Sequence, residues 1–360
     1  MNLALPHPPK EICLLRLSAI GDTCHVVPVV RTLQKVWPDT RIVWVIGKLE
    51  ASLMAGMEGV EFIIFDKSRG WDAYRNLRSQ LAGRKFEVLL CMHASLRANL
   101  AGRMIDADMR LGFDRARAKD FQWLFTSHRI PATPRQHVLD GFFEFIRTLG
   151  VTEKDLRWDI PVPDEDREFA RQLIPDSDRP TLMISPCSSQ RARNFRNWLP
   201  EHYARVADFA SDKFGARVIL TGGPTDLEKQ YGEDISRLSQ CAPVNMIGKT
   251  SLKQLLALLS RASVLLCPDS GPAHMATAAG TPVVGLYATS NRHRTGPYLS
   301  QDLVVDAYPE AVRRQFGKSA DELPWGARVR DPASMELIRV EAVQMAIEKA
   351  LETARSRSAQ

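Results

Sequence analysis

Short apolar segments alternate with amphipathic segments along most of the chain, and this alternation constrains the fold more than any other feature. In the first half, expected strands at 12–17, 41–46, 62–65 and 86–91 are interspersed with expected helices at 23–37 and 71–82. In the second half, expected strands at 181–185, 216–220, 244–247, 264–267 and 282–287 are interspersed with expected helices at 199–214, 226–239, 251–260, from about 270, and at 336–354. This repetition predicts an α/β fold with two doubly wound parallel sheets, each covered by helices on both faces.

A proline-rich interval separates the two series of segments. Residues 150–180 contain Pro161, Pro163, Pro175 and Pro180 together with many acids, and they predict a short strand, a short helix and a linker. A length of 360 residues also fits two domains. We therefore expect an N-terminal domain at 1–175, a C-terminal domain at 176–335, and a final helix at 336–360 that packs back toward the N-terminal domain.

Several classes of protein are disfavoured by composition. No apolar run reaches the roughly 18 residues of a membrane-spanning helix, and residues 1–10 contain three prolines and no apolar stretch of a secretion signal. Six cysteines without a CxxC pair indicate reduced thiols and a cytoplasmic protein. The sheet pattern would suit an NAD-dependent dehydrogenase, but the GxGxxG fingerprint is absent.

The excess positive charge is confined to two short stretches. The chain carries a net charge of +6; residues 110–135 hold six Arg or Lys against two Asp, and residues 184–200 hold three Arg and no acid. The rest of the chain therefore has a net charge of −1. This distribution predicts two anionic ligands rather than a general affinity for nucleic acid.

The first candidate site is Ser18-Ala-Ile-Gly21-Asp22, between the first expected strand and helix. Gly21 permits a tight turn or a close approach of a ligand. Asp22 lies at a carboxyl strand end, where such sheets bind their ligands. A helix N-cap is the alternative interpretation of Asp22, and the spacing leaves both open.

The second candidate site is Asp269-Ser270-Gly271-Pro-Ala-His274, after a strand and at the start of an alanine-rich helix. Backbone N–H groups and the Ser270 hydroxyl at that helix start predict a phosphate site. An N-cap followed by a core histidine is the alternative.

Two further strand ends carry weaker signals. Ser188 and Ser189 are followed by three arginines, of which Arg196 precedes Asn197-Trp198, and such groups suit a pyrophosphate. Asp226 follows a Thr-Gly-Gly-Pro turn and could bind ribose hydroxyls or cap a helix.

A metal site is not expected. The Asp-x-Asp pairs Asp106/Asp108, Asp164/Asp166 and Asp176/Asp178 do not follow buried strands in the way a diphosphate-bound metal requires, and the histidines and cysteines show no ligand spacing.

Taken together, these motifs resemble glycosyltransferase family 9, the bacterial lipopolysaccharide heptosyltransferases. Leu15-Arg-Leu-Ser-Ala-Ile-Gly-Asp22 with His25 and Pro28 resembles the opening of that family, and Asp269–His274 followed by 280–287 resembles its C-terminal donor motif. The turns at 222–224 and 295–298 match as well. The resemblance extends from about residue 11 to residue 352.

The resemblance implies a GT-B fold, with two Rossmann-like domains that face each other across a cleft. It implies inverting transfer of heptose from ADP-heptose to the Kdo or inner-core region of lipopolysaccharide, with no cofactor and no bound metal. It also implies a location at the cytoplasmic face of the inner membrane, as a peripheral protein that binds an anionic lipid acceptor and no nucleic acid.

Roles follow by position in the motifs. The resemblance makes Asp22 the general base, and it places Ser188, Ser189, Arg196, Ser270, Gly271 and His274 near the diphosphate, Asp226 at the ribose and Asp269 at the transferred sugar. An extra residue before Pro200 leaves open whether Arg193 replaces Arg196. We expect the acceptor to contact Gly21, His25, Arg97, Arg115, Arg117 and Lys119.

Two alternatives remain at this point. One is a family relative that uses another nucleotide-sugar or another acceptor. The other is a catalytically silent protein that binds a nucleotide.

Overall fold

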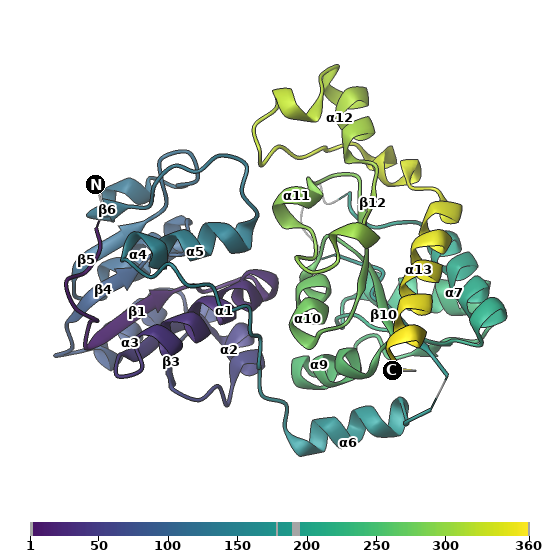
Figure 1. Cartoon of the computed structure of the whole chain (residues 1–360), viewed down its shortest axis with the longest axis horizontal. Coiled ribbons are helices and arrows are strands. Elements are labelled where there is room, and N and C mark those ends of the chain that lie inside the picture. Colours follow the sequence, from purple (N-terminus) through teal and green to yellow (C-terminus); the bar gives the residue numbers. More distant parts are fainter. Residues whose placement is uncertain (1–2, 178, 189–194, 359–360) are drawn as a thin grey trace. The chain divides into compact units, whose positions relative to one another are not determined.

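The computed structural model describes residues 3–177, 179–188 and 195–358, with side chains described as far as Arg355. The chain divides into two compact units, Met1–Pro161 and Val162–Gln360, which are described separately below. Figure 1 shows the course of the chain and the labels of its elements.

The first unit is built around a six-stranded sheet in the order β3-β2-β1-β4-β5-β6, in which every neighbouring pair is parallel. Its strands are β1 (Glu11–Leu15), β2 (Arg41–Gly47), β3 (Val60–Phe65), β4 (Phe86–Leu90), β5 (Ala107–Gly112) and β6 (His128–Arg129). Its α-helices are α1 (Ile20–Val36), α2 (Lys48–Met54), α3 (Trp71–Gln80), α4 (Leu96–Arg103) and α5 (Val138–Thr148), with 3₁₀ turns at Lys67–Arg69 and Gln122–Leu124.

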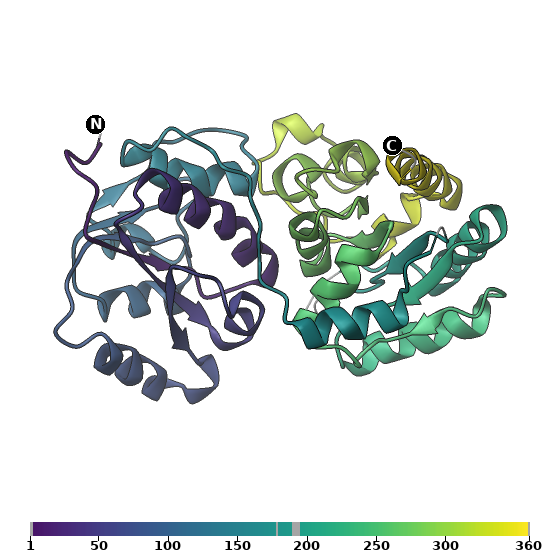
Figure 2. The same cartoon turned by 60° about the horizontal axis from the view of Figure 1, so that its bottom comes forward.

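Side chains alternate between the two faces of this sheet, so both faces are covered. Cys13 and Leu15 of β1 join a buried cluster with Leu77 of α3 and Ala101 of α4. Helices α1 and α5 pack against each other on the opposite side of the sheet (Figure 2).

The second unit repeats the architecture with a sheet in the order β12-β11-β10-β7-β8-β9, again parallel throughout. Its strands are β7 (Thr181–Ile184), β8 (Arg217–Leu220), β9 (Val244–Asn245), β10 (Val264–Pro268), β11 (Val283–Tyr287) and β12 (Val305–Asp306). Its α-helices are α6 (Asp164–Leu173), α7 (Pro200–Phe214), α8 (Asp226–Leu238), α9 (Leu252–Arg261), α10 (Gly271–Ala279), α11 (Arg292–Thr295), α12 (Tyr308–Phe316) and α13 (Val340–Ser358), with 3₁₀ turns at Gln301–Leu303, Ala320–Glu322 and Pro332–Leu337.

The two sheets share one topology. In each sheet the first strand lies at the centre, and beside it the order in which later strands are added changes direction. The switch falls between β1 and β4 in the first unit and between β7 and β10 in the second. The predicted α/β class with two doubly wound parallel sheets is thus confirmed. Doubly wound sheets bind ligands beyond the carboxyl ends of the strands at this switch point.

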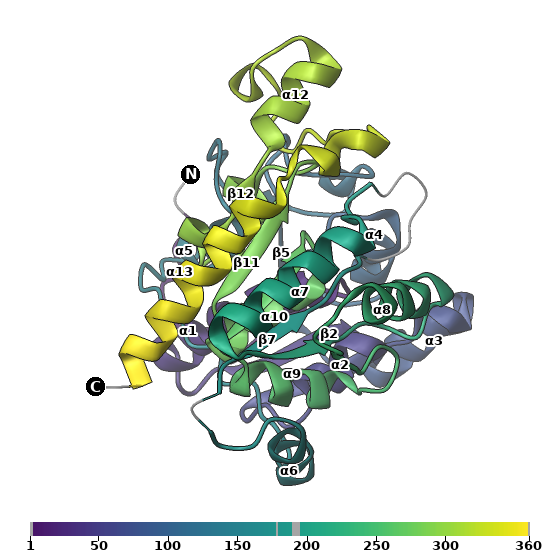
Figure 3. The same ribbon diagram turned by 90° about the vertical axis from the view of Figure 1, so that its right-hand side faces the viewer.

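The division of the chain differs from the boundary expected at 175. Helix α6 packs against α9 and therefore belongs with the second unit (Figures 1 and 2). Helix α13 lies along α7 and contacts β10 and β11 of its own unit (Figure 3). Its packing toward the first unit stays a prediction.

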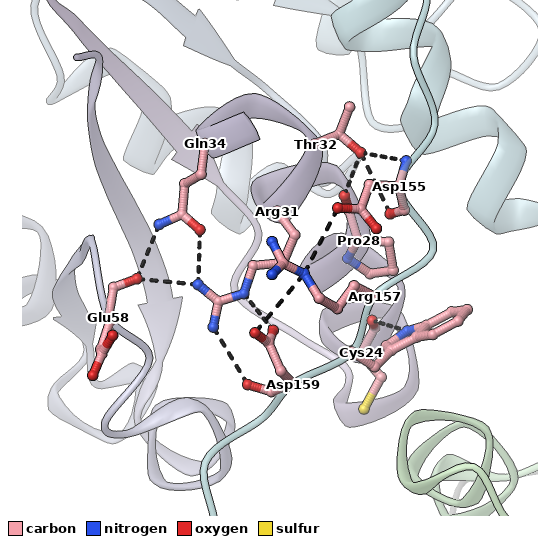
Figure 4. A network of polar contacts seen from close by, with 10 residues as sticks. Cys24, Pro28, Arg31, Thr32, Gln34, Glu58, Asp155, Arg157 and Asp159 are labelled. Carbon is pink, nitrogen blue, oxygen red and sulfur yellow. Dashed lines mark hydrogen bonds and ion pairs between the residues drawn. The ribbon is translucent and has the colours of Figure 1, made fainter. Parts of the chain in front are cut away.

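The short strand expected within 150–180 is absent from the described residues of that interval, and residues 150–163 bind to α1 instead of a sheet. The Arg31 Nε donates to Asp159 Oδ1 at 2.5 Å, the Asp155 N–H donates to Thr32 Oγ1 at 3.0 Å, and the Trp158 indole donates to the Cys24 carbonyl at 3.0 Å. Figure 4 shows this network, in which Arg31 also donates to Gln34. The segment is thereby fixed along α1 before the chain enters the second unit.

Candidate active site

The first group of functional side chains lies at the switch point between β1 and β4. Asp22 occupies the first turn of α1, where a carboxylate is favoured by the helix dipole. The N-cap residue is Ala19, so Asp22 does not cap the helix by position. Its side chain forms an ion pair with the Arg16 guanidinium and stays 33% exposed. Asp22 is thus oriented from one side and open to solvent on another.

Arg16 is buried and has three contacts that fix its guanidinium. Besides the ion pair with Asp22, its Nη1 donates to the Met92 carbonyl at 2.7 Å, and its guanidinium carbon lies 5.2 Å from the centre of the Phe142 ring. Burial lowers the pKa of Arg16, whereas the Asp22 carboxylate raises it. Arg16 was not among the predicted site residues, although an arginine at the end of an otherwise apolar strand is a recognisable signal.

His93 follows β4 and lies beside this pair. Its Nδ1 accepts a hydrogen bond from the Leu17 N–H at 3.3 Å. Gln122 steadies the same loop, because its side-chain amide donates to the carbonyls of Cys91 at 3.0 Å and His93 at 3.3 Å. Burial, followed by the charge of Arg16, lowers the pKa of His93 to about 3, so the ring is neutral at physiological pH. His93 was not among the predicted site residues.

The predicted acceptor residues of this unit differ in their exposure to solvent. Gly21 is buried in the first turn of α1, and His25, one turn further, is only 2% exposed and meets the His137 ring edge-on at 5.3 Å. Arg97 is exposed in the first turn of α4. Contact of these residues with an acceptor stays a prediction.

The basic stretch expected to bind the acceptor contains both exposed cations and a cation that is engaged in an ion pair. Arg115 and Lys119 are exposed, and the Arg115 guanidinium lies 5.5 Å from the Trp123 ring centre. Arg117 instead forms an ion pair with Asp114 and donates to the Pro131 carbonyl at 3.0 Å. Its guanidinium therefore stabilises the segment that connects these two residues. This engagement leaves Arg117 less available to a ligand than its neighbours.

The second group of functional side chains lies at the switch point between β7 and β10. Asp269 follows β10 and is 6% exposed. Its Oδ2 accepts from the Ser290 hydroxyl at 2.8 Å and lies 3.4 Å from Arg196 Nη1 and 3.9 Å from Arg328 Nη1. Arg196 also donates to the Asp269 carbonyl at 2.8 Å. Two arginines therefore converge on one buried carboxylate.

Neither Ser290 nor Arg328 was predicted from the sequence. Ser290 opens a basic loop in which Asn291 caps α11 and Arg292 donates to the Gln301 carbonyl at 2.7 Å. That donation, together with an ion pair to Asp306, explains why this loop contains arginine at 292.

Helix α10 begins at Gly271, two residues after Asp269. Ser270 is its N-cap residue, but the Ser270 hydroxyl donates to the Pro268 carbonyl at 3.1 Å and does not cap the helix. Gly271 starts the helix, and His274 is buried in its second turn. The first turn thus lacks a side-chain cap, which suits an anion at this helix end.

The remaining predicted donor residues frame the same sheet edge. The Ser188 N–H donates to Asn197 Oδ1 at 2.9 Å. Ser189 and Arg193 lie outside the described residues. Asp226 is exposed at the first position of α8, whereas Glu228 accepts from the Gly223 N–H at 2.7 Å and from the Thr225 hydroxyl at 2.7 Å. The acid that holds the glycine turn is therefore Glu228.

The described residues show neither a cluster of metal-ligating side chains nor a membrane-spanning helix. No group of three or more His, Cys, Asp and Glu side chains there is arranged to hold a metal ion. Within the same residues, no helix has the length and apolar character needed to cross a membrane.

Both units are Rossmann-like, have the same strand order and carry charged side chains at the switch point. They define a two-domain α/β protein of the kind that binds nucleotides. Comparison with known proteins narrows this class. Residues 74–325 match the model of glycosyltransferase family 9 (heptosyltransferase). The chain is 41% identical over 335 residues to the lipopolysaccharide core heptosyltransferase OpsX of Haemophilus influenzae, covering 93% of this chain and 95% of the relative.

Solved structures agree with the fold. A family 9 glycosyltransferase from Veillonella parvula superposes with a TM-score of 0.78 at 22% identity, over 98% of this chain and 99% of that one. The heptosyltransferase WaaC of E. coli, solved with ADP, superposes with a TM-score of 0.72 at 17% identity, over 94% of this chain and 99% of that one. The chain belongs to glycosyltransferase family 9, the heptosyltransferases, and is a transferase.

Proposed function

We propose that the protein transfers L-glycero-D-manno-heptose from ADP-heptose to the Kdo or inner-core region of lipopolysaccharide, with inversion at the anomeric carbon and without a metal. The observation that carries this proposal is the 41% identity to a lipopolysaccharide core heptosyltransferase along almost the whole of both chains. The presence of ADP in the solved E. coli heptosyltransferase supports the choice of nucleotide.

In the proposed reaction an acceptor hydroxyl attacks the anomeric carbon from the face opposite the diphosphate. A bond forms between that oxygen and the carbon, the bond to the phosphate oxygen breaks, and the configuration inverts. Asp22 takes the hydroxyl proton as general base. The contact with Arg16 supports this role, since it fixes the carboxylate while leaving it partly exposed.

The departing ADP needs positive charge, which the second unit can supply through its own side chains. We assign the diphosphate to Arg196, Ser188, Ser189, Ser270, Gly271 and His274, the ribose to Asp226, and the transferred sugar to Asp269. The pair of arginines beside Asp269 and the uncapped start of α10 support this assignment.

A surface of the first unit with exposed apolar and basic side chains fits a lipid acceptor at the cytoplasmic face of the inner membrane. Three large apolar side chains there are 54–71% exposed, and three exposed cations are close to them in sequence. We call this set the 96–124 surface; it consists of Leu96, Phe121, Leu124, Arg97, Arg115 and Lys119. Asp120 connects the residues at 115–124 with those at the start of α4. Its side chain accepts from the Leu96 N–H at 2.9 Å, and its carbonyl accepts from the Asn99 side chain at 2.8 Å. Apolar side chains among cations suit an anionic bilayer surface.

The donor and acceptor are tested together by mass spectrometry. The protein is incubated with ADP-heptose, and separately with UDP- and GDP-sugars, in the presence of defined Kdo-lipid acceptors with and without a first heptose. We expect the mass of one heptose to be added from ADP-heptose only. Transfer of another sugar, or from another nucleotide, would replace this assignment by that of a family relative with different substrates.

A further inference from the structure

His93 lies beside the proposed general base without taking part in the mechanism described so far. The Arg16 guanidinium connects the two, because it binds Asp22 with one nitrogen and the carbonyl of Met92, the residue before His93, with another. The Leu17 N–H adds a second link, since it donates to the ring of His93. Both links join the end of β1 to the end of β4 at the switch point.

These contacts decide which nitrogen of the ring carries the proton. A neutral imidazole has one N–H and one acceptor nitrogen, and a nitrogen that accepts a hydrogen bond has no proton. Since Nδ1 accepts from Leu17, the proton is on Nε2. Burial and Arg16 lower the pKa of His93 to about 3, so the ring keeps this form over the working range of pH. No described residue forms a hydrogen bond with Nε2, and the side chain is only partly buried.

We propose that His93 binds the acceptor, by donating its Nε2–H to an oxygen of the sugar whose hydroxyl Asp22 deprotonates. This proposal rests on the proposed function, because that function makes Asp22 the base on the acceptor side. A neutral donor next to a carboxylate fits a sugar well, since the carboxylate accepts from one hydroxyl while the imidazole donates to a neighbouring oxygen. A protonated histidine would instead compete with the acceptor for Asp22.

Two amide substitutions separate acceptor binding from a purely structural role. Asparagine places its oxygen near the position of Nδ1 and can keep the contact with Leu17, but its N–H groups do not reach the position of Nε2. Glutamine places an N–H donor near Nε2 and gives up the position of Nδ1. His128→Gln is the matched control, because His128 is a partly exposed histidine of the same unit whose ring forms a hydrogen bond with the Ser127 hydroxyl at 2.9 Å, away from Asp22.

Initial rates are measured with ADP-heptose and a Kdo-lipid acceptor for His93→Asn, His93→Gln and His128→Gln. We expect His93→Asn to raise the KM for the acceptor about tenfold, the effect of losing one hydrogen bond, with the KM for ADP-heptose within about twofold of the parent. We expect His93→Gln and His128→Gln to stay within about threefold of the parent for both substrates. The proposal is overturned if His93→Asn keeps the parent KM for the acceptor, or if His93→Gln is impaired more than His93→Asn.

A second measurement keeps the proposal testable if the protein transfers a different sugar. In ¹⁵N-histidine spectra of the full chain, His93 is assigned by comparison with His93→Gln, and Kdo-containing oligosaccharide and maltose are titrated separately. We expect the Nε2 signal of His93 to shift with the Kdo sugar and not with maltose. An unshifted Nε2 signal at a sugar concentration that shifts other signals would refute His93 binding, whereas absent heptose transfer by the parent would refute the proposed function instead.

Discussion

The buried guanidinium of Arg16 binds the Asp22 carboxylate and the Met92 carbonyl at the same time. Arg16 lies at the end of β1, Asp22 in the first turn of α1, and Met92 after β4, so one side chain ties three segments together at the switch point of the sheet. The position of the proposed base therefore depends on Arg16 as well as on the backbone of α1.

Replacing Arg16 with methionine should lower kcat more than it affects donor binding. The uncharged side chain keeps much of the volume but removes both polar contacts, and a misplaced catalytic group costs about 100-fold in rate. We expect kcat to fall about 10- to 100-fold while the thermal shift produced by ADP stays close to that of the parent. Arg84→Met is the control, since Arg84 pairs with Glu11 and Glu61 at the other end of the sheet. A parent-like kcat in Arg16→Met would show that Asp22 is positioned without Arg16.

Asp269→Asn should distinguish binding of the transferred sugar from binding of the nucleotide. The substitution keeps the shape of the side chain but removes the charge that Arg196 and Arg328 share. We expect the Kd for ADP-heptose to rise about tenfold and the Kd for ADP to stay within about threefold, measured by calorimetry. Asp234→Asn serves as the control, because Asp234 pairs with Arg237 on the outer side of α8. An equal loss of affinity for both ligands would place Asp269 at the diphosphate.

The 96–124 surface predicts binding to anionic vesicles. Phe121 and Leu124 are 62% and 71% exposed, and burying two such side chains in a bilayer interface is worth several kcal/mol in total. We expect Phe121→Ser with Leu124→Ser to lower the partition coefficient on phosphatidylethanolamine–phosphatidylglycerol vesicles at least tenfold. Trp71→Ser, at a side chain of α3 that is 71% exposed, should leave sedimentation with the vesicles unchanged. Equal losses in both variants would contradict a role specific to this surface.

Lys253 gives a prediction about stability and pH. It is buried on α9, and burial lowers its pKa from 10.5 to about 8, with Asp166 acting in the opposite sense. Below pH 8 the lysine is protonated in both the folded and the unfolded chain, so the full cost of burying its charge is present. As the pH rises from 8 to 10.5 the folded chain loses the proton first, and the cost disappears.

Lys253→Met should therefore stabilise the protein most at neutral pH. We expect an increase in the free energy of unfolding of about 2 kcal/mol at pH 7 that shrinks toward pH 10, measured by urea denaturation at each pH. Lys249→Met is the control, because Lys249 is exposed. A stabilisation that does not change with pH would mean that packing, rather than charge, explains the effect.

The sequence predicted strands and site residues best where an apolar run marks a buried strand and a polar residue follows it. The buried strands β1 and β2 contain continuous apolar runs, and Asp22 and Asp269 each come after a strand, so both could be placed at carboxyl strand ends in advance. Strand β5 was missed because Ala-Asp-Met-Arg-Leu-Gly lacks such a run.

Contacts between distant segments could not be predicted in this way. Met92 and His93 lie 76 residues from their partners Arg16 and Leu17, and only the pairing of β1 with β4 brings them together. The sequence singled out Asp226 as a ribose ligand or a helix cap but gave no sign that Glu228, two residues further on, accepts from the Gly223 N–H and the Thr225 hydroxyl. Local spacing identifies candidate acids, but the tertiary fold decides which of them are engaged.

The role of Asp22 as general base can be measured by single-turnover transfer with Asp22→Asn. Enzyme in excess over acceptor is mixed with ADP-heptose, and the heptosylated product is followed by mass spectrometry alongside the thermal shift that ADP produces. We expect that asparagine, which cannot take up the proton, slows transfer at least about 100-fold while the ADP shift is retained. Transfer at close to the parent rate, with ADP bound normally, would show that Asp22 is not the general base.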